Sequence, residues 1–209
     1  MKRSNLYAEM LENNMASGGK GDDQDTGSFK DTIVKQLIVL LKNFIWKQIE
    51  RRSLGNAEMI RKVLDTPQLN TPQMQKISRC LQAVGDQVDG DVQSAMKDQT
   101  MRPSLENYIK VVLGIFSDGE INWGRVVTVF SFTCLFVLKA YEDNIFDMIK
   151  NIINWTVDYF RNTVVNWIRD QGGWEGIYSY LGTPTWQTVA VFLAGVLTTL
   201  FITHNARRP

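Results

Sequence analysis

The stretch that decides the fold runs Val126-Val-Thr-Val-Phe-Ser-Phe-Thr-Cys-Leu-Phe-Val-Leu138 and holds 13 residues without a charge. A helix that is apolar on every side is typical of the centre of a bundle, where neighbouring helices cover it. Asn122 stands shortly before the stretch and can cap its first turn. The stretch is too short for a conventional membrane span. It therefore predicts an all-α bundle with this helix at its centre.

Apolar residues on both sides of this stretch recur at three- and four-residue spacing, as they do along the buried side of a helix. No segment shows the sustained alternation of a strand. A break is expected near Asn162, and Gly172–Gly173 should end the helix that contains it. The expected helices cover about 29–52, 72–97, 104–116, 122–141, 144–169 and 174–181, with a short helical turn at 57–64.

The chain divides into three parts by composition. Residues 1–28 are expected to be flexible, because the polar, Gly-rich and acidic run Gly18–Gly27 cannot bury enough surface to order itself. Residues 29–183 have the length of one helical domain. Residues 184–209 form a C-terminal helix and tail.

Bulk composition excludes several classes of function. The net charge is +1, with 23 basic and 22 acidic residues, so no nucleic-acid partner is indicated. Cys80 and Cys134 lie in apolar helical surroundings and are expected to be reduced thiols, although a disulfide stays possible. The one histidine is His204, and the Gly-rich runs match no phosphate-binding motif. We expect no catalytic activity, no cofactor and no metal site.

The C-terminal segment Trp186–Thr203 has 18 residues without a charge. As a helix it would span about 27 Å, just enough for a hydrocarbon core of roughly 30 Å. So close to the C-terminus, it would insert after synthesis, into a membrane that faces the cytosol. Four threonines keep the alternative of a buried core helix open. The expected anchor residues are Trp186, Val189, Phe192, Leu193, Val196, Leu197, Leu200, Phe201 and Ile202.

The helix expected at 72–97 carries a candidate binding segment that ends at Asp89. Its apolar residues share one helical face and are Ile77, Leu81, Val84 and Val88. Gly85 lies beside that face, where glycine costs about 1 kcal/mol against alanine and suggests a close approach by another backbone. Asp86 could orient a partner's cation, as in helix-in-groove recognition. An ordinary amphipathic core helix is the alternative.

Three motifs, taken in order, resemble the homology motifs of the Bcl-2 family. They are Leu81…Gly85-Asp86, Asn122-Trp-Gly-Arg125 and Gly172-Gly-Trp-Glu-Gly176, followed by an apolar tail. Further stretches are similar to the pore-forming, pro-apoptotic members: Phe116-Ser-Asp-Gly119, Val137-Leu-Lys-Ala140 and Gly182-Thr-Pro-Thr-Trp-Gln-Thr-Val189. The resemblance covers roughly residues 29–203 and is dense after Leu105.

The resemblance implies that the 77–89 segment of one molecule is a donor helix that enters a groove of another. The groove would include Asn122, Trp123, Gly124 and Arg125, with Asp86 paired to Arg125 across the contact. Gly172, Gly173 and Trp174 would be a structural motif. The tail could fill the same groove at rest, when the protein is cytoplasmic.

Activation would then give homodimers and larger oligomers that permeabilise the mitochondrial outer membrane and release factors such as cytochrome c. The implied partners are further copies of the chain, other family proteins and their donor-motif peptides, and the lipids of that membrane. Two alternatives stay open: an anti-apoptotic member that captures effectors in its groove, and a tail-anchored adaptor without pore activity.

Overall fold

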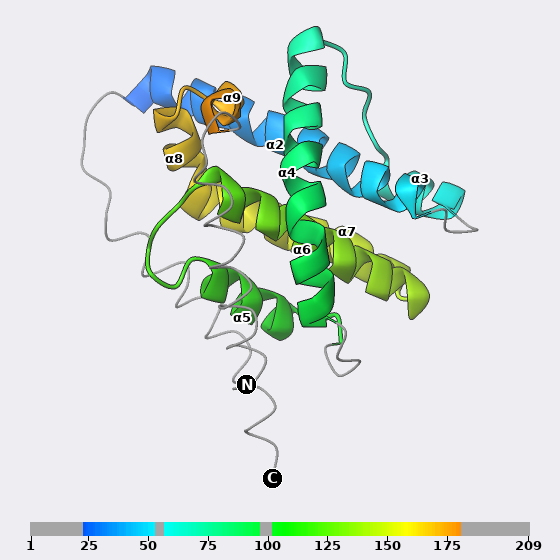
Figure 1. The fold of residues 1–209 in the computed structure, drawn as a ribbon. Coiled ribbons are helices and arrows are strands. Elements are labelled where there is room, and N and C mark those ends of the chain that lie inside the picture. Colours follow the sequence, from blue (N-terminus) through cyan, green and yellow to red (C-terminus); the bar gives the residue numbers. More distant parts are fainter. Residues whose placement is uncertain (1–22, 53–56, 97–101, 181–209) are drawn as a thin grey trace.

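The computed structural model describes residues 23–52, 57–96 and 102–180, and every regular element within these ranges is a helix (Figure 1). The all-α prediction is confirmed. The elements are α2 (Asp23–Arg51), α3 (Ala57–Leu64), α4 (Pro72–Met96), α5 (Leu105–Ile115), α6 (Trp123–Glu142), α7 (Phe146–Tyr159), a π-helical turn (Phe160–Val164), α8 (Val165–Asp170), a 3₁₀ turn (Trp174–Gly176) and α9 (Ile177–Tyr180).

Helix α6 is the centre of the bundle, as its sequence predicts. Sixteen of its 20 residues are buried, and α2, α4, α5 and α7 all pack against it. Figure 1 shows α4 crossing both α2 and α6 at a steep angle. With its flanks the helix is longer than the uncharged stretch, and it is long and apolar enough to cross a membrane. Because most of it is buried, the same composition also fits the core of a soluble protein.

Local signals place three helix ends as expected. The backbone N–H of Asn107 donates to Ser104 Oγ at 3.2 Å, and that of Arg125 donates to Asn122 Oδ1 at 3.0 Å. Gly172 and Gly173 have φ of +81° and +85°, a left-handed conformation that ends α8 and that glycine adopts without strain. Both predicted caps and the predicted stop are confirmed.

Two boundaries differ from the expected ones. Helix α2 begins at Asp23, six residues before the expected start, because an established helix gains one hydrogen bond for each residue that joins it. The helix expected at 144–169 begins at Phe146 and is interrupted at Phe160–Val164, where the π-helical turn stands at the predicted break. The anchor segment lies outside the described residues, so the division at 184 stays a prediction.

Both cysteines are free thiols, as predicted. Cys134 of α6 is buried, and burial raises the pKa of its thiol to about 12. Cys80 of α4 is half-buried, and burial raises the pKa of its thiol as well.

Three buried hydroxyl groups join α5, α6 and α7. Tyr108 Oη lies 2.6 Å from Thr156 Oγ1 and 3.2 Å from Thr133 Oγ1. Thr133 also donates to the carbonyl of Val129 at 2.7 Å, and Thr156 to that of Ile152 at 2.8 Å. Burial raises the pKa of Tyr108 to about 12, so the phenol stays protonated and can donate.

We expect Tyr108→Phe to lower the free energy of unfolding by about 1 kcal/mol, because it removes the buried donor of this cluster. Urea denaturation would measure the loss as a lower midpoint at unchanged slope. Tyr178→Phe is the matched control, since its hydroxyl makes an exposed 3.5 Å contact to Gln73 O. Equal effects of the two substitutions would contradict the assignment.

Candidate protein-binding site on helices α4 and α6

The apolar face of α4 points into the bundle. Ile77, Leu81 and Val84 are each at most 3% exposed, and α4 packs on α6 and α2. The side chain of Val88 lies outside what the structure describes. In this state the segment is an amphipathic core helix, which was the alternative interpretation. A donor role for the same face requires that α4 first leave its place.

Gly85 leaves room for an aromatic ring. A Cβ atom at this position would stand 2.6 Å from Cζ of Phe44 in α2, well inside contact distance. Within one chain, the group next to Gly85 is thus a side chain, and the close approach of a partner's backbone stays a prediction. Phe44 is buried and lies edge-on to Phe130 of α6, with ring centroids 5.7 Å apart. The ring is therefore held on both sides.

Ion pairs hold the polar side of α4 to the end of α2. Asp86 binds Arg51, and both side chains are about half exposed. Arg52 Nη2 lies 2.7 Å from Asp89 Oδ1, in a pair whose side chains are 23% and 24% exposed. An exposed pair such as Asp86–Arg51 contributes about 0–1 kcal/mol, whereas the Arg52–Asp89 pair is largely buried. The two ion pairs therefore join the end of α2 to α4, one at the exposed rim and one nearer the interior.

Arg125 lies at the first turn of α6 with its side chain 6% exposed. Its guanidinium binds both carboxylate oxygens of Asp118, with 2.6 Å between Arg125 Nη2 and Asp118 Oδ2. Arg125 Nη1 also donates to the carbonyl of Glu120 at 2.6 Å. The loop before α6 is thus folded back onto the helix. Within one chain, Arg125 pairs with Asp118 and Asp86 pairs with Arg51, so the Asp86–Arg125 contact between two molecules stays a prediction.

The Asp118–Arg125 pair should make stability depend on pH. Hydrogen bonds from Arg125, with one from the backbone N–H of Glu120, hold the pKa of the Asp118 carboxyl well below its usual range. A carboxyl whose pKa is lower in the folded state stabilises the fold above its unfolded pKa of about 4 and loses that contribution as the pH falls through the folded pKa.

We therefore expect the stability difference between the natural chain and Asp118→Asn to be full at pH 7 and to shrink below about pH 4. Urea denaturation at a series of pH values would measure it. A difference that stays constant with pH would show that the carboxylate charge is not what stabilises the loop.

Three tryptophan rings pack together at the start of α6, one of which belongs to its first residue. The Trp123 ring lies 5.1 Å from that of Trp167 and 5.8 Å from that of Trp174, between centroids. Gly172 and Gly173 turn the chain so that Trp174 enters the core, where its indole N–H donates to the carbonyl of Ile33 in α2 at 3.2 Å. The Gly-Gly-Trp motif thus joins the end of the described helical domain to α2.

Comparison with known proteins identifies the family to which a chain with this arrangement of helices belongs. A family model described as "Apoptosis regulator proteins, Bcl-2 family" matches residues 77–174. "Apoptosis regulator BAX" from Mus musculus is 38% identical over 184 residues, which cover 86% of this chain and 94% of that protein. This chain belongs to the Bcl-2 family. The human BAX sequence (Homo sapiens) is likewise 38% identical over 187 residues, with the same coverage of both chains.

Other Bcl-2 family members match over less of their length or at lower identity. "Apoptosis regulator Bcl-2" from Gallus gallus is 29% identical over 106 residues, or 47% of this chain and 45% of that protein. The crystal structure of chicken BOK aligns with a TM-score of 0.58 at 18% identity, covering 72% of this chain and 96% of that one. A structure of Trichoplax adhaerens trBcl-2L2 bound to trBak BH3 gives a TM-score of 0.58 at 19% identity, covering 71% of this chain and 98% of that one.

These findings make the chain a Bax-like apoptosis regulator with a Bcl-2 fold. Its candidate donor residues and candidate groove residues lie on α4 and α6, which pack on each other in one bundle. Sequence reasoning missed Asp118, Arg51 and Phe44 as their partners. In the sequence, the turn Ser117–Glu120 stands just before Asn122, and the helix that becomes α2 ends in basic residues. Neither feature shows that Asp118 pairs with Arg125 or that Arg51 pairs with Asp86.

Proposed function

We propose that this chain promotes cell death by assembling into oligomers that permeabilise the mitochondrial outer membrane and release factors such as cytochrome c. It acts by binding and insertion, without catalysis. The observation that carries the proposal is the extent of its likeness to BAX, which is 38% identity over 94% of the Mus musculus protein. The likeness to Bcl-2 from Gallus gallus covers less than half of either chain.

The arrangement of α4 suggests how activation proceeds. The donor face is buried at rest, so α2 and α4 must separate before Ile77, Leu81 and Val84 can enter the groove of a second molecule. Asp86 would exchange Arg51 for Arg125 of that molecule. That Trichoplax trBcl-2L2 was crystallised with trBak BH3 supports other family members and their donor peptides as further partners.

The same proposal gives the chain two locations. At rest it is cytoplasmic, with residues 184–209 free to occupy the chain's own groove. After activation this segment anchors it in the outer membrane. Fractionation of cells before and after a death stimulus tests the movement, and a chain that stays in one fraction contradicts it.

Dye release from liposomes tests the pore directly. Purified protein with an activating donor-type helical peptide should empty the vesicles, and Asp86→Arg should slow release at least tenfold, because like charges at the contact cost several kcal/mol. Asp31→Arg, an exposed charge reversal on α2, is the matched control. The double exchange Asp86→Arg with Arg125→Asp should restore part of the dimerisation. Circular dichroism checks that each variant is folded.

Two other results would favour other functions. Peptide binding without dye release favours an anti-apoptotic member that sequesters effectors. No dye release and no peptide binding by the natural chain, with the function of Asp86→Arg in cells equal to that of Asp31→Arg, favours a tail-anchored adaptor that does not use the donor contact.

A further inference from the structure

Two threonine–proline pairs lie in the segment that leads from α3 into α4. They are Thr66-Pro67 and Thr71-Pro72, and a third pair, Thr183-Pro184, falls outside the described residues. Proline has no backbone N–H, and it favours an extended conformation of the residue before it. One class of protein kinase requires such a proline directly after the threonine or serine that it phosphorylates. Each pair is therefore a candidate target.

The two described pairs differ in how far a kinase can reach the threonine. Thr71, Pro72 and the following Gln73 are exposed. Thr66 is half-buried, and its hydroxyl oxygen is buried without a hydrogen-bond partner in the described part of the chain. Because a kinase must bring the hydroxyl oxygen against its nucleotide, the structure leaves Thr71 open and shields Thr66.

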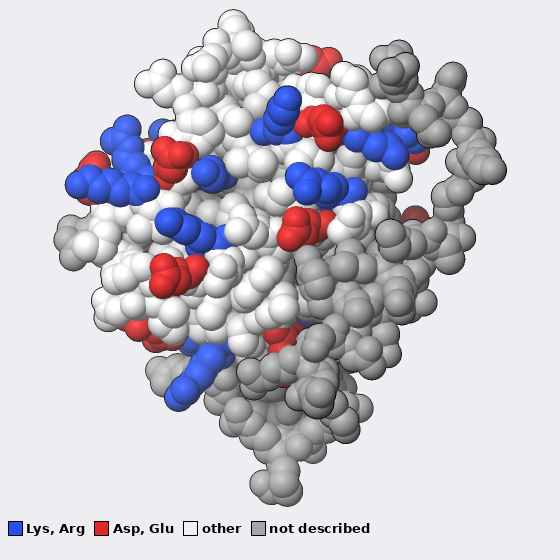
Figure 2. All heavy atoms as spheres, turned by 180° about the vertical axis from the view of Figure 1, so that it is seen from behind, with Lys and Arg blue, Asp and Glu red and all other residues white. Residues whose placement is uncertain are grey.

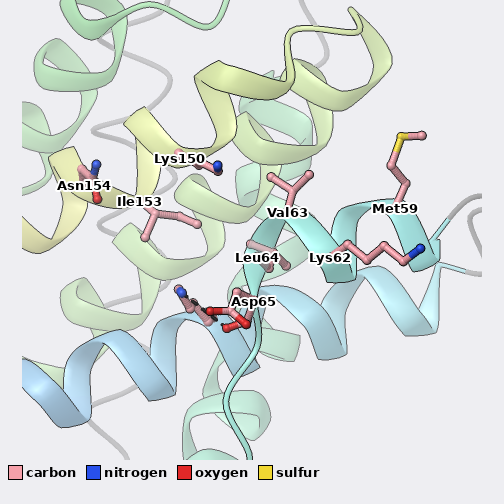
Figure 3. Close-up of a pocket in the computed structure, with 9 residues that line it drawn as sticks. Met59, Lys62, Val63, Leu64, Asp65, Lys150, Ile153 and Asn154 are labelled. Carbon is pink, nitrogen blue, oxygen red and sulfur yellow. Dashed lines mark hydrogen bonds between the residues drawn. The ribbon is translucent and has the colours of Figure 1, made fainter.

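The chain around Thr71 can be bound in an extended form. Residues 66–70 form no regular element, and Figure 1 shows this loop rising to the outer end of α4. Figure 3 shows the loop leaving α3 just after Asp65. On the other side, the backbone N–H of Met74 donates to Thr71 Oγ1 at 3.2 Å across the exposed first turn of α4. Helix ends fray, so this turn can open when the segment is bound.

The sequence that follows Asp65 is free of negative charge for 20 residues. From Thr66 to Gly85 there is no acidic residue, and the charged side chains are Lys76 and Arg79. Helix α4 has no acidic side chain in its first turn, whereas α3, α5 and α7 each have one there. Elsewhere the two signs are mixed, as Figure 2 shows for the face seen from behind. A phosphate on Thr71 would supply the negative charge that stabilises the N-terminal turn of a helix.

We propose that Thr71 is phosphorylated by a proline-directed protein kinase and that the phosphate stabilises the first turn of α4. Thr71 Oγ1 forms a bond to the γ-phosphorus of ATP, and the bond from that phosphorus to the β,γ-bridging oxygen breaks. The hydroxyl proton passes to a base of the kinase, and the products are phosphothreonine and ADP. Phosphate oxygens then accept from the backbone N–H groups of Gln73 and Met74 in place of Oγ1. The inference does not depend on pore formation.

Phosphorylation of the purified full chain tests the site. The chain is incubated with ATP and a mitogen-activated protein kinase, which requires proline after its target, and is then cut with trypsin. Cleavage after Lys62 and Lys76 releases residues 63–76, and fragmentation of this peptide in a mass spectrometer distinguishes Thr71 from Thr66. We expect on the order of tenfold more phosphate on Thr71, because local opening must first expose the hydroxyl of Thr66. Phosphate on Thr183 would appear in a different peptide.

Three single substitutions serve as matched controls. Thr71→Val should remove nearly all phosphate from residues 63–76, whereas Thr66→Val should leave it unchanged. Thr71→Ser keeps both the cap and the target hydroxyl, so this variant should still be phosphorylated. A synthetic peptide of residues 63–76 exposes both threonines and should show a weaker preference for Thr71. Absence of phosphate on Thr71 in the folded chain, or equal labelling of Thr66 there, would overturn the proposal.

Hydrogen exchange measures the effect of the phosphate on α4. The amides of Gln73 and Met74 should exchange about two to five times more slowly after phosphorylation, the gain expected from a negative group at a helix N-terminus. The amide of Asn107, which Ser104 caps at the same distance of 3.2 Å in α5, is the control and should not change. Exchange in α4 that is unchanged or faster, or an equal change at Asn107, would overturn the proposed effect on the helix.

Discussion

Trp174→Ala is expected to lower the free energy of unfolding by about 3–5 kcal/mol, the usual cost of removing a large buried aromatic side chain. Trp174 is 1% exposed, and its ring packs against those of Trp123 and Phe130, with centroids 5.8 and 6.0 Å away. Its indole N–H also donates to Ile33 O, 141 residues earlier in the chain. The substitution would leave a cavity at the junction of α2, α6 and the C-terminal turns.

Trp174→Phe separates the two contributions. It keeps an aromatic ring but removes the donor to Ile33, so its loss should be clearly smaller than that of alanine. Urea denaturation of both variants gives the comparison. A loss below about 1 kcal/mol for Trp174→Ala would contradict the view that this side chain fastens the helical domain to α2.

Gly85→Ala is expected to destabilise the chain by about 1–3 kcal/mol, the range for overpacking a filled core. The new methyl group would meet the Phe44 ring at 2.6 Å, and Phe130 limits how far that ring can retreat. Gly90, five residues on in the same helix, is the matched control, because no atom lies within 4 Å of its virtual Cβ. Gly90→Ala should stabilise the helix by about 0.5–1 kcal/mol.

A second substitution checks the cause. Phe44→Leu shortens the opposing side chain, so the loss from Gly85→Ala should be smaller in that background than in the natural chain. Strict additivity would mean that the ring is not the obstacle.

The features predicted best from the sequence are those that depend on contacts between residues close together in the chain. The caps at Ser104 and Asn122 and the stop at Gly172–Gly173 depend on groups a few residues apart, and the structure has all three. The uncharged stretch Val126–Leu138 predicted the centre of the bundle, because a helix without a polar face can be covered only by other helices.

Long-range partners could not be predicted in the same way. Gly85 signals a close approach, but the ring that fills the space comes from Phe44, 41 positions away. Arg125 could serve any carboxylate within reach, and only the path of the loop brings Asp118 to it. The charge and type of a residue indicate the kind of partner it can bind, but the fold determines which residue lies within reach.

The hydroxyl cluster of Tyr108, Thr133 and Thr156 has a consequence for a bundle that opens in lipid. Each threonine donates to a carbonyl four residues earlier in its own helix, so α6 and α7 can part with both of these hydroxyl protons still bound. The phenol of Tyr108 lies within hydrogen-bond distance of both threonines, so it can keep one of them as a partner. It would be unsatisfied only if α5 parted from both helices, and in hydrocarbon an unsatisfied hydroxyl costs several kcal/mol. Separation of α6 from α7 therefore leaves every hydroxyl of this cluster with a partner, provided that α5 stays with one of the two helices.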